Sequence, residues 1–128
     1  MATLGKELFV TTDNKVGTLL KVAAPIKEAG VSIRACCAWG DGTKANFLLV
    51  TDNNDKANQA LKKAGLSPQE SEAVLTELPN RIGSLAEAAQ KLANAGVDID
   101  HCYVSASGGQ ALAVFATKDN AKALKALG

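Results

Sequence analysis

The chain contains one seven-residue pattern twice, 66 positions apart. Residues 13–19 read DNKVGTL and residues 79–85 read PNRIGSL, so an Asn, a base, a β-branched aliphatic residue, a Gly, a small hydroxyl residue and a Leu recur in order. The offset continues beyond this segment, and about 17 of the 56 pairs between residues 7–62 and 73–128 are identical. Because both copies have to adopt the same structure, this duplication constrains the fold more than any other feature.

Each copy has the periodicities of a strand, a helix, two strands and a second helix. An Asp-Gly step at 41–42 indicates a β-hairpin, and the Gly at 30 is a suitable helix stop. Residues 1–6 are expected to be a loose terminus and residues 66–71 a linker. The predicted strands are 7–12, 31–39 and 44–51, then 72–78, 97–105 and 110–117; the predicted helices are 15–29 and 56–64, then 80–95 and 121–127.

This order predicts an α+β fold of ferredoxin-like βαββαβ units, in which two helices cover one face of an antiparallel sheet. We expect two tandem units, residues 1–69 and 70–128. A complete unit needs a fourth strand. The segment 72–78 can serve the first copy but must also begin the second, which is left without one. An unpaired sheet edge invites pairing with another chain.

The helix starts carry two further predictions. Asp13 or Asn14 is expected to cap the helix of the first copy, because either side chain can accept an amide hydrogen of the first turn. Spacings of three and four residues predict one apolar, core-facing stripe on the first helix of each copy. The stripes consist of Val16, Leu19, Leu20, Ala23 and Ile26 in the first copy and of Ile82, Leu85, Ala86, Ala89 and Leu92 in the second.

Composition excludes several classes of protein. The net charge is +1 without a basic cluster, and aromatic residues make up 4% of the chain, which disfavours nucleic-acid binding. No apolar run approaches the roughly 20 residues of a spanning helix, so no membrane association is expected. Three cysteines without a disulfide framework fit a reduced, cytoplasmic protein.

The residues Cys36, Cys37, His101 and Cys102 are the only metal- or redox-like group. Neighbours on a strand point to opposite faces, so adjacent members cannot easily share one ion. For the same reason His101 and Cys102 alone do not form a nucleophilic pair. We therefore expect buried apolar thiols, no cofactor and no enzymatic activity. A thiol or metal protein is kept as the weakest alternative.

Three features are shared by both halves: the repeated turn, the Ala-Gly-Val-x-Ile strand entry and the βαββα order. By these features each half resembles an ACT domain, the small-molecule regulatory module of many amino-acid biosynthetic enzymes. The resemblance covers nearly the whole chain and implies a tandem ACT protein without a catalytic domain. It implies a non-catalytic regulator that binds an amino acid or a related small metabolite at a domain or subunit interface. It also implies a homodimer, with an amino-acid metabolic enzyme as a candidate partner. The other reading is a structural or partner-binding module whose ligand sites are vestigial.

The resemblance implies that the ligand lies at the turn between the first strand and the first helix. A helix start offers amide hydrogens and partial positive charge to a carboxylate, and Gly lets the backbone approach it. The candidate ligand-binding residues are Asp13, Asn14, Val16 and Gly17 with Ser32, and Asn80, Ile82 and Gly83 with Asp98. Each of these residues also has an interpretation without ligand binding. The Asn residues would be simple helix caps, the Gly residues packing requirements and Asp98 a solvated strand end. Because Asp13 is matched by Pro79, the two sites are not expected to be equal.

Overall fold

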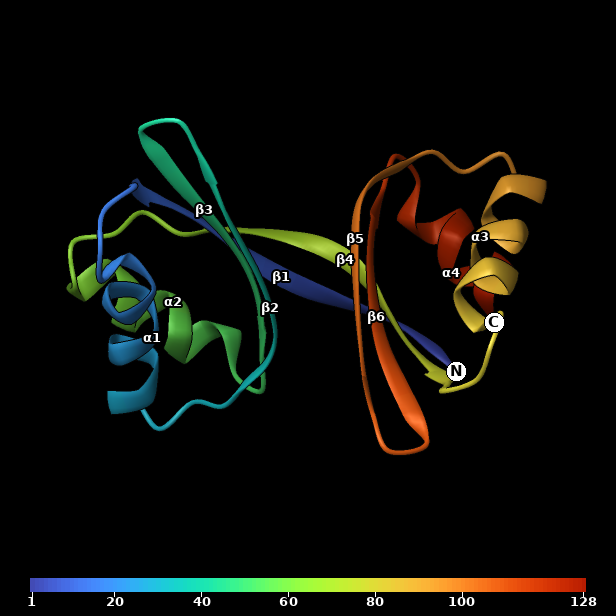
Figure 1. Ribbon diagram of the computed structural model, residues 1–128, viewed down its shortest axis with the longest axis horizontal. Helices are drawn as coiled ribbons and strands as arrows, with labels where there is room; N and C mark the ends of the chain where they lie inside the picture. The colour runs from blue at the N-terminus through green and yellow to red at the C-terminus, as the bar shows by residue number, and fades with distance from the viewer. The chain divides into compact units, whose positions relative to one another are not determined.

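The computed structural model describes all residues, 1–128, and contains six strands and four helices in the predicted order (Figure 1). None of the helices is long and apolar enough to cross a membrane. The elements are β1 (Ala2–Asp13), α1 (Thr18–Glu28), β2 (Ile33–Asp41), β3 (Lys44–Thr51), α2 (Asn54–Lys63), β4 (Gln69–Pro79), α3 (Ser84–Asn94), β5 (Ile99–Ser107), β6 (Gln110–Thr117) and α4 (Asn120–Leu127). The predicted α+β, ferredoxin-like class is therefore confirmed.

Contacts divide the chain into two compact units. One comprises Lys6–Ser71 and is called the first-repeat unit; the other joins Met1–Gly5 to Glu72–Gly128 and is called the second-repeat unit. The prediction that residues 1–69 and 70–128 form two separate domains stays a prediction. Each unit is described on its own below.

In the first-repeat unit, β3 lies between β1 and β2 and pairs antiparallel with both. The register sets Leu8 opposite Leu49 and Val10 opposite Phe47, which places these four side chains on one face of the sheet. Both helices lie on that side of the strands (Figure 1). Their buried residues complete a single core, to which α1 contributes Val22 and Ile26 and α2 contributes Ala57 and Leu61.

The second-repeat unit uses the same plan with different side chains. Here β6 lies between β4 and β5, and α3 and α4 supply Ala88, Leu92 and Ala123 to the core. At the positions of Phe47 and Leu49 this unit has Ala113 and Phe115, both buried. The aromatic ring therefore moves two residues along the strand, away from the hairpin tip.

The first residues of the chain are not a loose terminus. Strand β1 begins at Ala2, whose N–H donates to the Gly128 carbonyl at 3.3 Å. The Thr76 hydroxyl lies 3.4 Å from the Met1 carbonyl, and Ala2 packs against the core of the second-repeat unit. The prediction of a loose terminus for residues 1–6 is therefore wrong, because these contacts join residues far apart in sequence, which no local pattern reveals.

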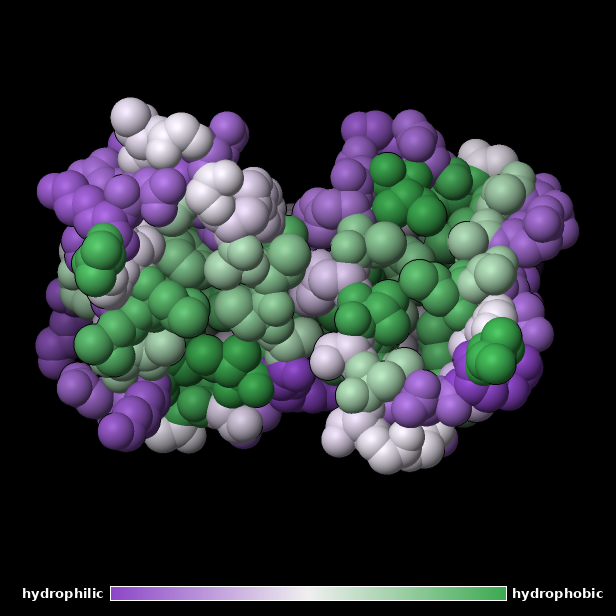
Figure 2. All heavy atoms as spheres, viewed as in Figure 1, coloured by the Kyte–Doolittle hydropathy of each residue, from purple (hydrophilic) through white to green (hydrophobic).

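The predicted core-facing stripes are confirmed only at Ile26 and Leu92 and are wrong at most other positions. Helix α1 buries Val22 and Ile26 but leaves Leu19 58% and Leu20 70% exposed, and α3 buries Ser84, Ala88 and Leu92 while Leu85 remains 46% exposed. Both helices begin three to four residues later than predicted, so the turn residues included in each stripe are not helical. Apolar residues consequently gather on the surface over α1 (Figure 2).

One side-chain clip occurs in both units and ties the second helix to the sheet. The Asn54 side-chain oxygen accepts hydrogen bonds from the N–H (3.2 Å) and the hydroxyl (2.5 Å) of Thr51, and its Nδ2 donates to the Lys6 carbonyl at 2.9 Å. Asn120 makes the corresponding bonds to Thr117 and Glu72. The clip thus joins the end of a hairpin strand to the first strand of the same unit.

Replacing Asn54 by Ala should lower the free energy of unfolding by about 1–3 kcal/mol, because the partly buried N–H and hydroxyl of Thr51 lose their partner and the exposed bond to Lys6 is lost as well. The matched control is Gln59→Ala on the exposed part of the same helix, which should change stability by at most about 0.5 kcal/mol. Urea unfolding measures both. Equal losses in the two variants would contradict the role of the clip.

Candidate functional site

Each repeated turn reverses the chain through a Gly in the left-handed conformation. Gly17 has φ 91° and Gly83 has φ 90°, and each occupies the N-cap position without a side-chain hydrogen bond to the helix. The prediction that Asp13 or Asn14 caps this helix is therefore wrong. An L-residue at these φ values is strained, so the turn itself requires Gly and leaves the first helical amides without a capping side chain.

The two Asn residues of the turns hold the neighbouring hairpin tip. Asn14 donates from its backbone N–H to the Thr43 carbonyl (2.8 Å) and from Nδ2 to the Gly42 carbonyl (3.2 Å). Asn80 repeats this arrangement with Gly109 (2.9 Å) and Gly108 (2.8 Å). The Nδ2 group of each Asn thus fixes the turn to the hairpin. Neither Asn acts as a simple helix cap.

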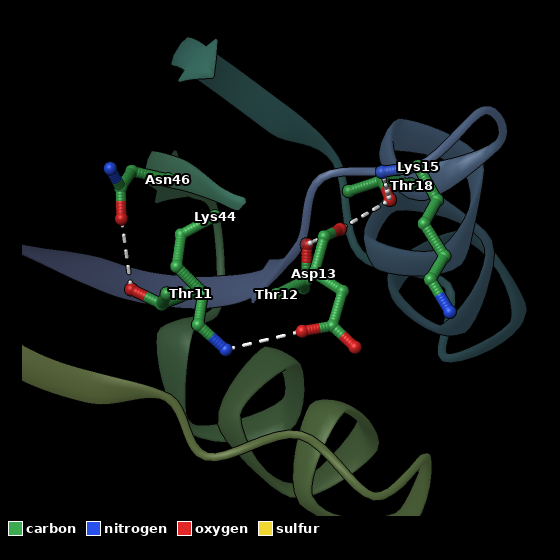
Figure 3. A network of polar contacts seen from close by, with 7 residues as sticks. All are labelled: Thr11, Thr12, Asp13, Lys15, Thr18, Lys44 and Asn46. Atoms are coloured by element: carbon green, nitrogen blue, oxygen red, sulfur yellow. Dashed lines mark hydrogen bonds and ion pairs between the residues drawn. The ribbon is translucent and has the colours of Figure 1, made fainter. Parts of the chain in front are cut away.

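A hydroxyl at the first helical residue closes the turn from the inside (Figure 3). Thr18 Oγ1 donates to the Asp13 carbonyl at 2.9 Å and lies 3.3 Å from the Lys15 N–H, from which it accepts. Ser84 Oγ donates to the Pro79 carbonyl at 2.6 Å. The repeated hydroxyl therefore has a structural role in both copies.

Ion pairs flank the two turns differently. Lys44 Nζ lies 3.1 Å from Asp13 Oδ1 in the first copy, and the hydrogen bond and charge of Lys44 lower the pKa of that carboxyl (Figure 3). In the second copy Pro79 removes this pair, and Arg81 instead makes two bonds to Glu87, at 3.1 and 2.9 Å, which lower the pKa of the Glu87 carboxyl. Both pairs are solvent-exposed, so their effect on stability is small.

A shallow depression of about 320 Å³ lies beside the first turn. A Cβ built on Gly17 would meet no atom within 4 Å, so the backbone here is open to solvent. Lys15 is the only ionisable residue of the lining, which is otherwise uncharged. The lining consists of Asn14, Lys15, Gly17, Thr18, Leu19, Ala38, Trp39, Gly40, Ala45 and Phe47. An uncharged surface with one cation and a helix start suits a small carboxylate with an apolar part.

The second turn is equally open at Gly83, where a Cβ would also meet nothing within 4 Å. The depression of about 250 Å³ found near it is lined by Arg81, Ser84, Glu87 and Lys91 among others, and it includes neither Asn80 nor Gly83. These two depressions therefore differ in their lining, and the expected inequality of the sites stays a prediction.

The remaining predicted residues lie apart from this depression or at its edge. Val16 and Ile82 are fully exposed at the tips of the turns. Ser32 and Asp98 follow the C-terminal ends of α1 and α3, so an 11-residue helix of about 16 Å separates each from the Asn of its own unit. Their backbone groups pair locally: the Ser32 N–H donates to Asp52 Oδ1, and the Asp98 carbonyl accepts from the Lys118 N–H. The structure does not bring these residues together with the turn within one unit.

The cysteines correct a further expectation. Cys36 and Cys102 are exposed and Cys37 is intermediate, so the prediction of buried thiols is wrong for the repeated pair. Both lie on strands that have one strand neighbour, which leaves their outer flank uncovered. Partial desolvation and the adjacent Cys37 raise the pKa of the Cys36 thiol, so it stays protonated at neutral pH. No three His, Cys, Asp or Glu residues are grouped so as to hold a metal ion.

The chain thus contains two ferredoxin-like units, and each has an open glycine turn between its first strand and its first helix. This combination is typical of a paired small regulatory module. A family model described as an ACT domain pair matches residues 3–127, and the chain belongs to this family. None of the curated proteins matches it significantly. The signal that identified the family from sequence was the doubled turn; Trp39, Phe47 and Ala38 of the depression carried no such signal.

Solved structures share the fold over nearly the whole chain. Protein BT0572 from Bacteroides thetaiotaomicron has 25% identity and a TM-score of 0.91, covering 98% of this chain and 88% of that one. The ligand-free regulatory subunit of aspartate kinase from Thermus thermophilus has 15% identity and a TM-score of 0.68, with coverages of 98% and 93%. An aspartate kinase from Clostridium acetobutylicum has 16% identity and a TM-score of 0.57; the match takes 98% of this chain and 33% of the longer one.

Replacing Gly17 by Ala should cost about 1–2 kcal/mol of stability, because the new Cβ finds open space but the left-handed backbone becomes strained. Gly109→Ala is the matched control: it also has open space, and its φ lies outside the left-handed region, so its change should stay within about 0.5 kcal/mol. Thermal and urea unfolding give both values. A Gly17 variant as stable as the Gly109 variant would refute the conformational requirement.

Proposed function

We propose that this protein is a non-catalytic regulator that binds an amino acid or a related small carboxylate at the strand–helix turn. The observation that carries the proposal is the depression beside Gly17, where an unobstructed left-handed Gly, the start of α1 and the Asn14 side chain meet. Membership of the ACT domain pair family supports a small-molecule-binding regulatory role. A regulatory role implies an amino-acid metabolic enzyme as partner, as in the aspartate kinases that share the fold.

The chemistry of the turn favours a carboxylate. Thr18 and Lys21 donate their amides to the Lys15 and Gly17 carbonyls, whereas the amides of Leu19 and Leu20 have no carbonyl four residues earlier within the helix. These two amides point toward the helix start together with its partial positive charge. Lys15 in the lining adds a positive charge. Asn14 has its Nδ2 engaged with Gly42, so its Oδ1 is the group that would accept from the ammonium of an amino acid.

We also propose a homodimer in which the ligand lies near a subunit boundary. Fully exposed Val16 and half-exposed Leu19 and Leu20 adjoin the first turn, and contiguous exposed apolar residues commonly mark interfaces. If Ser32 contacts the same ligand as Asn14, it has to come from a second copy of the chain, because the length of α1 separates the two within one unit. Asp98 stands in the same relation to Asn80.

The second candidate is a partner-binding module in which the turns no longer bind ligand. The exposed apolar residues favour it, since they would serve a protein partner equally well. It differs from the first candidate in predicting no response to small molecules.

Differential scanning fluorimetry with each of the twenty amino acids tests the proposal. At 100 times its dissociation constant a ligand should stabilise the protein by about 2.7 kcal/mol, which raises the melting temperature by several degrees. Asn14→Ala should reduce the shift if the first turn binds, and Asn80→Ala should reduce it if the second does. Lys27→Ala, at the far end of α1, is the control and should leave the shift unchanged. No shift with any amino acid at millimolar concentration would favour the partner-binding module instead.

A further inference from the structure

We propose that the first-repeat turn is the ligand-holding one and that it selects a carboxylate with a compact apolar side chain, admitted by the small residues Ala38 and Gly40. This inference rests on the proposed function and adds which of the two sites is used and for what class of ligand. It follows from comparing the two units position by position.

The small residues belong to the wall of the depression on the helix side of the sheet. Ala38 pairs with Phe47 and Gly40 pairs with Ala45, and both partners belong to the core beneath the helices. A residue and its cross-strand partner point to the same face, so position 38 faces the depression. At Gly40 a Cβ would come within 2.8 Å of Asn14 Nδ2, so Gly at this position lets the turn approach β2.

The second repeat has larger residues at both positions. Val104 stands at the place of Ala38 and Ala106 at the place of Gly40, again opposite core-side partners, Ala113 and Ala111. Phe47 and Ala113 are both buried, so the exposed wall beside each turn differs mainly through Ala38 and Val104, which are both exposed. The cavity observed near the second turn lies instead against the charged residues Arg81, Glu87 and Lys91.

The lining of the first depression defines the class of ligand. Leu19, Ala38, Ala45 and Phe47 present carbon surface, Lys15 supplies the single charge, and no carboxylate belongs to the wall. A ligand with a carboxylate and an apolar side chain matches both the charge of Lys15 and the carbon surface of the wall. A second charge or a polar side chain would be placed against carbon without a hydrogen-bond partner. A volume of about 320 Å³ lies at the low end for small-molecule sites and suits one amino acid.

The test is a calorimetric titration of the full chain with L-leucine and L-valine against L-serine, L-aspartate, L-lysine and the larger L-phenylalanine, with 4-methylpentanoate as the leucine analogue that lacks the ammonium and with melting temperatures measured alongside. L-Leucine or L-valine should bind about tenfold or more tightly than L-serine. Ala38→Val, which installs the second-repeat residue, should weaken that binding at least tenfold. The reciprocal variant Val104→Ala should leave it unchanged. Unchanged melting temperatures without ligand establish that both variants are folded.

Three results would overturn the inference. If polar amino acids bind more tightly than apolar ones, or if folded Ala38→Val binds as the parent does, the ligand class or the selecting position is wrong while the proposed function stands. If Asn80→Ala abolishes the binding of a probe while Asn14→Ala leaves it unchanged, the ligand is held at the second turn and the first-repeat assignment is wrong. If no probe gives a binding heat or raises the melting temperature, the proposed function fails together with the inference.

Discussion

The structure depends on a glycine with positive φ between the first strand and the first helix of each unit. At Gly17 and Gly83 the chain turns through the left-handed region, which places the helix start next to the hairpin of the same unit. An Asn side chain then holds the hairpin tip, and the hydroxyl of the first helical residue holds the end of the strand. In α1 the amides of Thr18 and Lys21 are bonded to the Lys15 and Gly17 carbonyls, and those of Leu19 and Leu20 have no carbonyl four residues earlier within the helix. The same constraint therefore shapes the fold and the candidate binding surface beside the turn.

Duplication preserved this framework while the surroundings diverged. The Asn clip at the second helix recurs in both units, and so do the Gly, the hydroxyl and the turn Asn. The ion pair beside the turn, the position of the aromatic core residue and the residues at 38 and 40 do not recur. The conserved set consists of backbone requirements, since each unit needs them to fold. The divergent set surrounds the depression, where the two copies are free to differ in ligand binding.

The order of elements, the fold class and the family were predictable from the sequence, because hydrophobic periodicity and the doubled turn are local signals. The start of the helix was not predictable. An Asp or Asn before an apolar run is as good a local cap as the Gly that follows, and only the contact with the hairpin decides against it. The stripe on α1 was wrong for a separate reason: Leu19 and Leu20 lie within the helix but on its uncovered face, while Val22 and Ile26 face the core. The contact of Met1 and Ala2 with the second-repeat unit, and the exposure of Cys36, depend on strand neighbours that no local pattern reveals. The candidate site was therefore predicted as a turn but not as a depression with a specific wall.

The central claim is that the open turn holds the ligand. The most direct measurement is a titration of the ¹⁵N-labelled protein with the amino acid that stabilises it most, followed by the backbone amide chemical shifts. The account predicts that the largest changes fall on residues 14–19 and on the facing strand at residues 38–40. It would be contradicted if those amides stayed unchanged while the changes gathered at the C-terminal ends of α1 and α2, or if no amide responded at saturating ligand.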